Sequence, residues 1–395
     1  MNLYRHKTLL ALMQLCIFSS MLGVGIIVPF LPLYARSLGA SALVMGLIFS
    51  AFSFTRTLSM PYVGMLSDRH GRRRFLIVGL AGYAVLALAL AVANTPWELV
   101  ANRALQGIFA GMIIPVSMAL VADITPAGRE GVSFGSFNTA LLLGFGVGPL
   151  IGGVVYDHWG LHTNFYLMAG LSLFSLVLVV LLVRDPERII PSGRGAGWRR
   201  QWELARERGL GSILAARAGQ SMGMGCFIAF LPAICQERGL SNAQVGWLLA
   251  ANVLVMTAAQ YPAGRLADRV NRVGLAVAGT ALSGLCKLLL IWPRGFGAFM
   301  LLMVIEGLAS GMALPSLTAL AVTNGRRLRA GMGTVMGLLG VAMSLGVILG
   351  TVLGGFLSDI WGFAAAFWVA GAGAAAGVGM LFFQFRIPQA ADGHT

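Results

Sequence analysis

Charged residues are scarce in this sequence. Only 11% of its 395 residues are Asp, Glu, Lys or Arg, whereas about a quarter of a soluble globular domain is charged. At the same time 57% of the residues are hydrophobic. Apolar runs of the ~20 residues that a helix needs to cross a bilayer recur along the whole chain. This composition excludes an ordinary soluble domain and predicts an all-α polytopic membrane protein.

Sequence signals for catalysis and for cofactors are also missing. The four cysteines show neither zinc-site nor redox spacing. No glycine-rich phosphate-binding loop occurs, which argues against ATP as the energy source. We therefore expect no enzymatic activity, no metal site and no bound cofactor.

Twelve apolar runs predict twelve membrane-spanning helices. Their approximate extents are 8–34, 43–66, 75–94, 98–122, 132–156, 164–184, 212–236, 243–266, 274–293, 296–322, 331–357 and 364–385. Arginines concentrate in alternate loops, and such loops face the cytoplasm. We therefore predict a multi-pass protein of the inner (cytoplasmic) membrane with both termini in the cytoplasm. The net charge of +14 is then a topology signal and does not indicate nucleic-acid binding.

The second half of the sequence repeats the first. Phe30-Leu-Pro32 recurs as Phe230-Leu-Pro232, and Gly107 and Gly111 recur as Gly307 and Gly311, each 200 positions later. We predict two pseudo-symmetric six-helix bundles, 1–184 and 212–395, joined by a cytoplasmic linker, 185–211. The basic end of this linker, WRRQWELARER, is either an interfacial amphipathic helix or a solvated segment. Transporters with such repeats bind their substrate near the bilayer midplane, between the repeats.

Three motifs resemble the signatures of one family. They are GMLSDRHGRRR from Gly64 to Arg74, Arg103-Ala-Leu-Gln106-Gly107, and the fifth-span segment from Gly144 to Gly153. Together the three motifs resemble those of the major facilitator superfamily, in particular its twelve-helix drug/proton antiporters. The resemblance implies the major facilitator fold, a small-molecule substrate, a proton gradient as the energy source, and function as a monomer in the lipid bilayer.

The first motif is the predicted cytoplasmic gate. The resemblance implies a charge relay among Asp68, Arg72 and Asp123 that locks one conformation; the simpler alternative is a topogenic basic loop. In the second repeat Thr323 aligns with Asp123, so we expect the lock in the first repeat only. The predicted gate residues are Gly64, Asp68, Arg69, Gly71, Arg72, Arg73 and Asp123.

The fifth span carries the antiporter motif. Three of its glycines recur at intervals of four and so share one helix face, which allows close approach of another helix. We expect this span to pack across the pseudo-symmetry interface, and we expect the proline to bend the helix. The residues of this motif are Gly144, Gly148, Pro149, Gly152 and Gly153.

Ionisable residues inside spans are costly and usually functional. Glu306 is the only carboxylate well inside a span, roughly 15 Å from its start. It could carry the coupled proton, anchor a cationic substrate, or form a static pair with a buried arginine. Arg103 could take part in proton coupling, hold an anionic group, or extend towards the membrane surface. Arg217 and Lys287 lie nearer span ends, and we expect both to extend outwards.

The substrate cavity is predicted from family geometry, in which spans 1, 4, 7 and 10 line it. The predicted cavity residues are Gln14, Met21, Arg56, Gln106, Gln220, Met224, Phe227 and Ser310. A Met-rich, weakly polar wall suits amphipathic ligands, although each residue could instead face lipid or bundle interior. We expect proton-coupled efflux of small amphipathic molecules. The alternatives are an importer, symporter or facilitator of a sugar, nucleoside or organic acid, a lipid translocase, or a receptor on the same scaffold.

Overall fold

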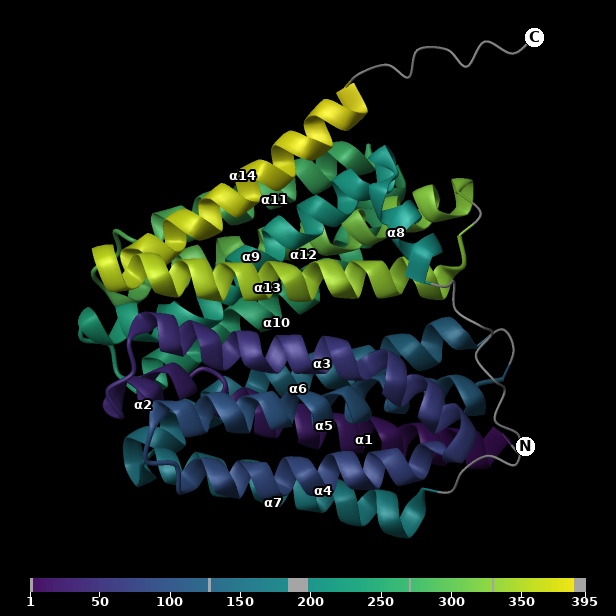
Figure 1. Ribbon diagram of the computed structural model, residues 1–395, viewed down its shortest axis with the longest axis horizontal. Helices are drawn as coiled ribbons and strands as arrows, with labels where there is room; N and C mark the ends of the chain where they lie inside the picture. Colours follow the sequence, from purple (N-terminus) through teal and green to yellow (C-terminus); the bar gives the residue numbers. More distant parts are fainter. Residues whose placement is uncertain (1–2, 127–128, 184–197, 270, 329, 387–395) are drawn as a thin grey trace. The chain divides into compact units, whose positions relative to one another are not determined.

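The structure, a computed structural model, describes residues 3–126, 129–183, 198–269, 271–328 and 330–386. Within these ranges it contains helices and no strand (Figure 1). The helices are α1 (Leu3–Ile27), α2 (Leu31–Ser37), α3 (Ala42–His70), α4 (Arg72–Ala91), α5 (Pro96–Ile124), α6 (Glu130–Trp159), α7 (Leu161–Leu182), α8 (Trp198–Arg206), α9 (Arg208–Glu237), α10 (Asn242–Arg269), α11 (Arg272–Leu289), α12 (Phe296–Arg327), α13 (Met332–Trp361) and α14 (Ala364–Arg386).

Within the ranges that the structure describes, twelve segments are long and apolar enough to cross a membrane, which confirms the predicted number of spans. The first, Lys7–Ser37, comprises most of α1 together with α2. It is interrupted at residues 28–30, just before Pro32, which lies in the first turn of α2 where its missing N–H costs no helical hydrogen bond. The repeat is visible in the backbone, because Gly39 and Gly239 both adopt a positive φ, of 83° and 78°.

The chain forms two compact units. The first unit comprises Met1–Gly193 and Ile228–Leu254, and the second comprises Arg194–Phe227 and Val255–Thr395. In the first unit α3 and α4 pack on α5, α1 packs on α6 and α7, and α4 also packs on α7. In the second unit α11 packs on α12 and α14, and α13 packs on α14. Helices α9 and α10 each contribute residues to both units.

The glycine face of α6 is in close contact with another helix backbone. A Cβ on Gly148 would lie 2.6 Å from the backbone of Gly25, and one on Gly152 would lie 2.3 Å from the carbonyl oxygen of Ile26. This face therefore packs directly on α1, a helix of the same repeat. The expected contact of this span across the pseudo-symmetry interface is made by other glycines of α6: a Cβ on Gly153 would lie 2.5 Å from the carbonyl oxygen of Asn242, and one on Gly146 would lie 3.1 Å from Leu254, both in α10 of the second repeat.

The basic end of the linker forms the short helix α8. Its Leu204 is buried in an apolar cluster with Leu210 and Ile213 of α9 and with residues of α11, α12, α13 and α14. Trp202 remains exposed, and the guanidinium of Arg206 stacks 4.8 Å above the centre of its ring. Since Leu204 attaches α8 to the second unit, a fully solvated segment does not describe it, and the contact of this helix with lipid stays a prediction.

Candidate functional site

The predicted proton carrier, Glu306, lies in a buried polar cluster of the second unit. Its Oε1 accepts hydrogen bonds from Lys287 Nζ at 2.6 Å, from Ser310 Oγ at 2.6 Å and from Ser283 Oγ at 2.9 Å. The Glu306 and Lys287 side chains are each only 5% exposed. Glu306 is thus one partner of a buried ion pair, supported by two hydroxyl groups. We call Ser283, Lys287, Glu306 and Ser310 the second-unit cluster.

Helix spacing and a glycine together create this cluster. Ser283 and Lys287 are four residues apart on α11, and Glu306 and Ser310 are four apart on α12, so each pair shares a helix face. The side chain of Lys287 runs past Gly223 of α9, where a Cβ would lie 2.9 Å from its Cδ. The absence of a side chain at position 223 therefore makes room for the lysine.

The expectation that Lys287 extends outwards was wrong. The residue lies two positions before the end of α11, yet its amine points inward to Ser283 and Glu306 and is covered. Arg217 is also held within its unit, because it donates to Gln220 Oε1 at 2.9 Å and contacts Met343 Sδ at 3.1 Å. Both side chains thus find their hydrogen-bond or ion-pair partners inside the unit and do not extend towards the membrane surface to reach water or lipid headgroups.

The first unit has a polar cluster in the corresponding place. Arg103 Nη1 donates to Gln106 Oε1 at 2.8 Å, and the Arg103 guanidinium lies 4.1 Å above the centre of the Phe52 ring. Tyr83 of α4 lies beside Arg103, and a Cβ on Gly107, the residue after Gln106, would lie 3.1 Å from the backbone nitrogen of Arg56. We call Arg56, Tyr83, Arg103 and Gln106 the first-unit cluster.

The two clusters occupy repeat-related positions but differ in charge. Gln106 corresponds to Glu306 and Tyr83 to Ser283, each at an offset of 200. Arg56 and Arg103 correspond to Met256 and Met303. The second-unit cluster contains one positive and one negative group, whereas the first-unit cluster contains two guanidiniums and no carboxylate. The residue differences between the two repeats at these positions thus give the two clusters different net charges.

The predicted gate residues meet at one end of the first unit. Arg72 pairs with Asp68, and its Nε donates to Asp123 Oδ2 at 3.1 Å. Its Nη1 also donates to Ser67 Oγ at 2.8 Å. Gly71, with φ of 95°, ends α3 and starts α4, a conformation that disfavours residues with a Cβ. The side chain of Arg72 is 5% exposed, so this three-residue ion pair network is held away from solvent.

The other gate residues contribute less to this network. Arg73 Nη2 donates to the carbonyl oxygen of Val180 in α7 at 2.5 Å, while Arg69 is exposed. A Cβ on Gly64 would meet no atom within 4 Å. In the second repeat, Arg272 donates to Thr323 Oγ1 at 3.2 Å, so a neutral hydroxyl stands where Asp123 accepts in the first repeat.

The remaining predicted cavity residues are dispersed. Gln14 Nε2 donates to Ser136 Oγ at 2.7 Å, and Met21 packs against Gly144 of α6. Gln220 is buried beside Arg217, Phe227 is buried, and Met224 is 41% exposed. Of the predicted residues in the second unit, Ser310 alone joins Glu306 in the second-unit cluster.

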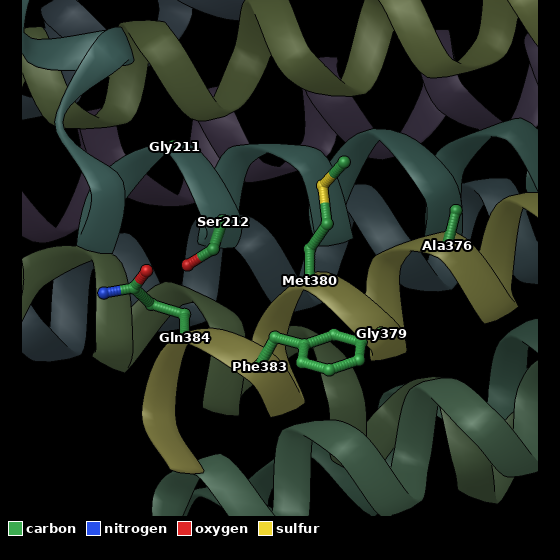
Figure 2. A pocket seen from close by; sticks show the side chains of 7 residues that line it. All are labelled: Gly211, Ser212, Ala376, Gly379, Met380, Phe383 and Gln384. Atoms are coloured by element: carbon green, nitrogen blue, oxygen red, sulfur yellow. The ribbon is translucent and has the colours of Figure 1, made fainter. Parts of the chain in front are cut away.

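A surface groove of about 690 Å³ lies between α9 and α14 (Figure 2). Its lining combines small and apolar side chains with two polar ones: Gly211, Ser212, Ala376, Gly379, Met380, Phe383 and Gln384. None of these residues belongs to either cluster or to the predicted gate. The groove is therefore separate from the residues that the sequence singles out.

Sequence comparison assigns the chain to a family. The model of the Major Facilitator Superfamily matches residues 13–216 and 213–394. "Uncharacterized MFS-type transporter MJ1560" of Methanocaldococcus jannaschii is 30% identical over 353 residues, which are 88% of this chain and 90% of that protein. The chain belongs to the major facilitator superfamily. It is therefore a membrane transporter of that superfamily, with twelve spans in the expected helical fold.

Other members of the superfamily match over a shorter part of the chain or at a lower sequence identity. "Quinolone resistance protein NorA" of Staphylococcus aureus is 31% identical over 179 residues, or 45% of each chain. Two solved structures share the fold. The human organic anion transporter MFSD10 (TETRAN) has a TM-score of 0.67 at 21% identity, covering 95% of this chain and 99% of its own. A bacterial homolog of the human lysosomal transporter Spinster has a TM-score of 0.82 at 13% identity, covering 98% of both.

For a transporter of this superfamily, the two clusters offer distinct chemistry. The second-unit cluster can exchange a proton, because a carboxylate and an amine share one short contact. The first-unit cluster presents positive charge and guanidinium and amide hydrogen-bond donors to a ligand, and it contains no carboxylate within the described residues. Sequence reasoning missed Lys287, Ser283 and Tyr83. The four-residue spacing of Ser283 and Lys287, and the repeat offset that relates Tyr83 to Ser283, were the signals that could have identified them.

Proposed function

We propose that this transporter is a proton-coupled exporter of small amphipathic molecules that works by alternating access. The observation that supports it is the buried Lys287–Glu306 ion pair, which contains the only carboxylate well inside a span. The half-length similarity to a protein named for quinolone resistance favours export of drug-like molecules. We further propose that the membrane is the inner membrane and that both termini are cytoplasmic.

The proton would act by changing which arrangement of α11 and α12 is stable. With Glu306 ionised, its charge balances that of Lys287, and the present packing is favoured. When Glu306 takes up a proton, Lys287 is left charged without its counterion in a buried place, which is costly. The protonated form therefore favours a different arrangement, in which water or another group reaches the amine. Proton binding and helix arrangement are coupled in this way.

The test is the Glu306→Gln variant, which mimics the protonated carboxyl group and gives position 306 the residue of Gln106. In proteoliposomes with an imposed pH gradient, uphill transport should be abolished. Substrate–substrate exchange at equal pH on both sides should persist, because exchange requires no net proton movement.

The matched control is Glu237→Gln, at an exposed glutamate that pairs with Arg36 at 3.3 Å near the end of α9. It should transport like the wild type. Uphill transport by Glu306→Gln at the wild-type rate would refute the proton-coupling role. Loss of both uphill transport and exchange, in a variant that still folds and melts cooperatively, would also contradict it, because a purely coupling residue is not needed for exchange.

The Arg72 network would serve as the cytoplasmic gate of this exporter. It links the end of α3, the start of α4 and the end of α5 through one guanidinium. Removing a charge from it should slow the conformational change while leaving the distant ligand contacts intact. Asp68→Asn should therefore reduce the transport rate with an unchanged Kd, and a weakened Kd with a native melting temperature would contradict a gating role.

A further inference from the structure

The first-unit cluster has an unbalanced positive charge. Arg56 and Arg103 lie within spans and share the neighbourhood of Tyr83, and no carboxylate belongs to the cluster as far as the structure describes it. We propose that this cluster binds the anionic group of the transported molecule, so that the substrates are amphipathic organic anions. The inference rests on the proposed transport function, and it names the substrate class.

The hydrogen-bonding capacity of the cluster is only partly used. Arg103 is 4% exposed, and its Nε has no hydrogen-bond partner among the described residues. Gln106 is fully buried; it spends its oxygen on Arg103, and its Nε2 is likewise unpartnered in the part of the chain that the structure covers. Buried donors without acceptors cost free energy, so a ligand that supplies acceptor oxygens satisfies both groups at once.

Arg56 adds the second guanidinium. It is half-buried on α3, and its Nε has no partner within the described ranges. Its exposed part makes it the member of the cluster that an incoming ligand reaches first. A guanidinium presents parallel N–H groups that match two oxygens of a carboxylate, sulfonate or phosphate.

The carboxylates of the first unit are occupied elsewhere. Those whose side chains the structure describes lie near helix ends and have partners there: Asp68 and Asp123 with Arg72, Glu98 with Asn94 and Thr95, Asp157 with Asn242 and Ala243, and Glu237 with Arg36. None of them neutralises Arg103. A cationic ligand would be repelled by the cluster, whereas an anion would balance its charge.

The aromatic side chains around the Arg103 guanidinium indicate what the uncharged part of the ligand should be. Phe52 stacks against the Arg103 guanidinium at 4.1 Å, and Phe49 lies 5.8 Å from it. With Tyr83, these rings provide an aromatic wall beside the charged donors. A planar aromatic body that carries one anionic group fits both features.

The test compares three probes that share a naphthalene ring: 1-naphthylacetate, its neutral amide, and 1-naphthylmethylamine. Binding to the purified full-length protein is measured by calorimetry, and exchange is measured in proteoliposomes. The wild type should bind the acetate about ten- to a hundredfold more tightly than the other two probes. This factor in Kd corresponds to the free energy that a hydrogen bond to a charged group typically contributes.

Two substitutions, Arg56→Met and Arg103→Met, copy the residues that the second repeat has at these positions, Met256 and Met303. Each should lose most of the preference for the acetate and leave binding of the amide unchanged. Arg103→Lys keeps the charge without the paired N–H groups, and it should retain part of the preference. Melting temperatures of all variants separate loss of a ligand contact from loss of the fold.

Two results would overturn the proposal: a wild type that binds the amine or the amide as tightly as the acetate or binds none of the three probes, or folded methionine variants that keep the acetate preference. Neither result would affect the test of proton coupling. That test compares uphill transport by the wild type and by Glu306→Gln, and it can be carried out with any compound that the protein transports. Export of cationic compounds with normal pH coupling would thus refute the anion site and support the proposed function.

Discussion

Replacing Lys287 alone should destabilise the second unit more than replacing both members of its ion pair. Lys287→Met keeps an unbranched side chain of similar size and removes the charge, which leaves the Glu306 carboxylate buried without its lysine counterion while the Ser283 and Ser310 hydroxyls still donate to it. Adding Glu306→Gln then removes the stranded charge. The comparison of the single and double variants therefore measures how strongly the fold depends on charge balance at this point.

The size of the effect follows from the geometry. Two unit charges 2.6 Å apart attract each other by about 6 kcal/mol at an effective dielectric constant of about 20. Part of this attraction offsets the cost of burying both groups, and loss of one partner of a buried pair typically costs about 3–5 kcal/mol. The destabilisation has an upper limit of similar size, because a carboxyl group without its counterion can take up a proton instead. Protonating an ordinary glutamate at pH 7 costs about 4 kcal/mol.

Thermal unfolding can be followed with a thiol-reactive fluorophore, because all four cysteines are buried and unpaired. Substitution of Cys16 and Cys235 leaves Cys226 and Cys286, both of which belong to the second unit. A loss of 3–5 kcal/mol should lower its melting temperature by roughly 6–20 °C, given about 2–4 °C per kcal/mol in domains of similar size. The double variant should melt within a few degrees of the wild type.

Two outcomes would refute this reasoning. If Lys287→Met melts like the wild type, the ion pair is not a structural requirement and its members are not buried together. If the double variant is as unstable as the two single variants combined, the two side chains act independently, and the proposed coupling between proton uptake and helix arrangement loses its basis.

Two further predictions concern the first unit. Asp123→Thr copies Thr323 of the second repeat; the loss of a charged hydrogen-bond acceptor for Arg72 should cost about 1.5–3 kcal/mol and slow transport at saturating substrate, and an unchanged rate would contradict the gate. Gly148→Ala places a Cβ against the backbone of α1 and should destabilise the protein by about 1–3 kcal/mol, measured by the same thermal assay. The control Gly170→Ala, where a Cβ meets no atom within 4 Å, should have no such effect, and equal melting of both variants would count against close helix contact.

Sequence alone predicted the number and approximate extents of the spans. This part of the prediction succeeds because a chain in lipid must satisfy its backbone hydrogen bonds within each helix, so every crossing requires its own long apolar run. The packing partner of a helix face is a different matter. The four-residue spacing of Gly144, Gly148 and Gly152 defines a face, but it carries no information about which helix lies opposite. For that reason the contact with α1 was not predicted.

The structure buries Glu306 inside its span as expected, while its role in proton coupling stays a prediction; the expected outward direction of Lys287 was wrong. An acid within a span is rare enough to stand out by itself. The burial of Lys287 was judged from its distance to the end of α11, whereas it depends on α9, where Gly223 leaves space for the side chain. Lys287 is one of two lysines in a chain whose other basic residues are arginines and histidines, and this composition was a usable signal.

The contacts between α1 and α6 have a practical consequence for measuring motion. The backbones meet at Gly144, Gly148 and Gly152, and in the second unit the backbones of α13 and α9 meet in the same way at Gly346 and Gly350. At each of these glycines the nearest atom of the other helix belongs to its backbone, so we expect the two helices of each pair to move as one rigid body. Two spectroscopic labels, one on each helix of such a pair, should therefore report a constant distance throughout the transport cycle. This distance provides an internal reference within each unit, against which displacements of the other helices of that unit can be measured.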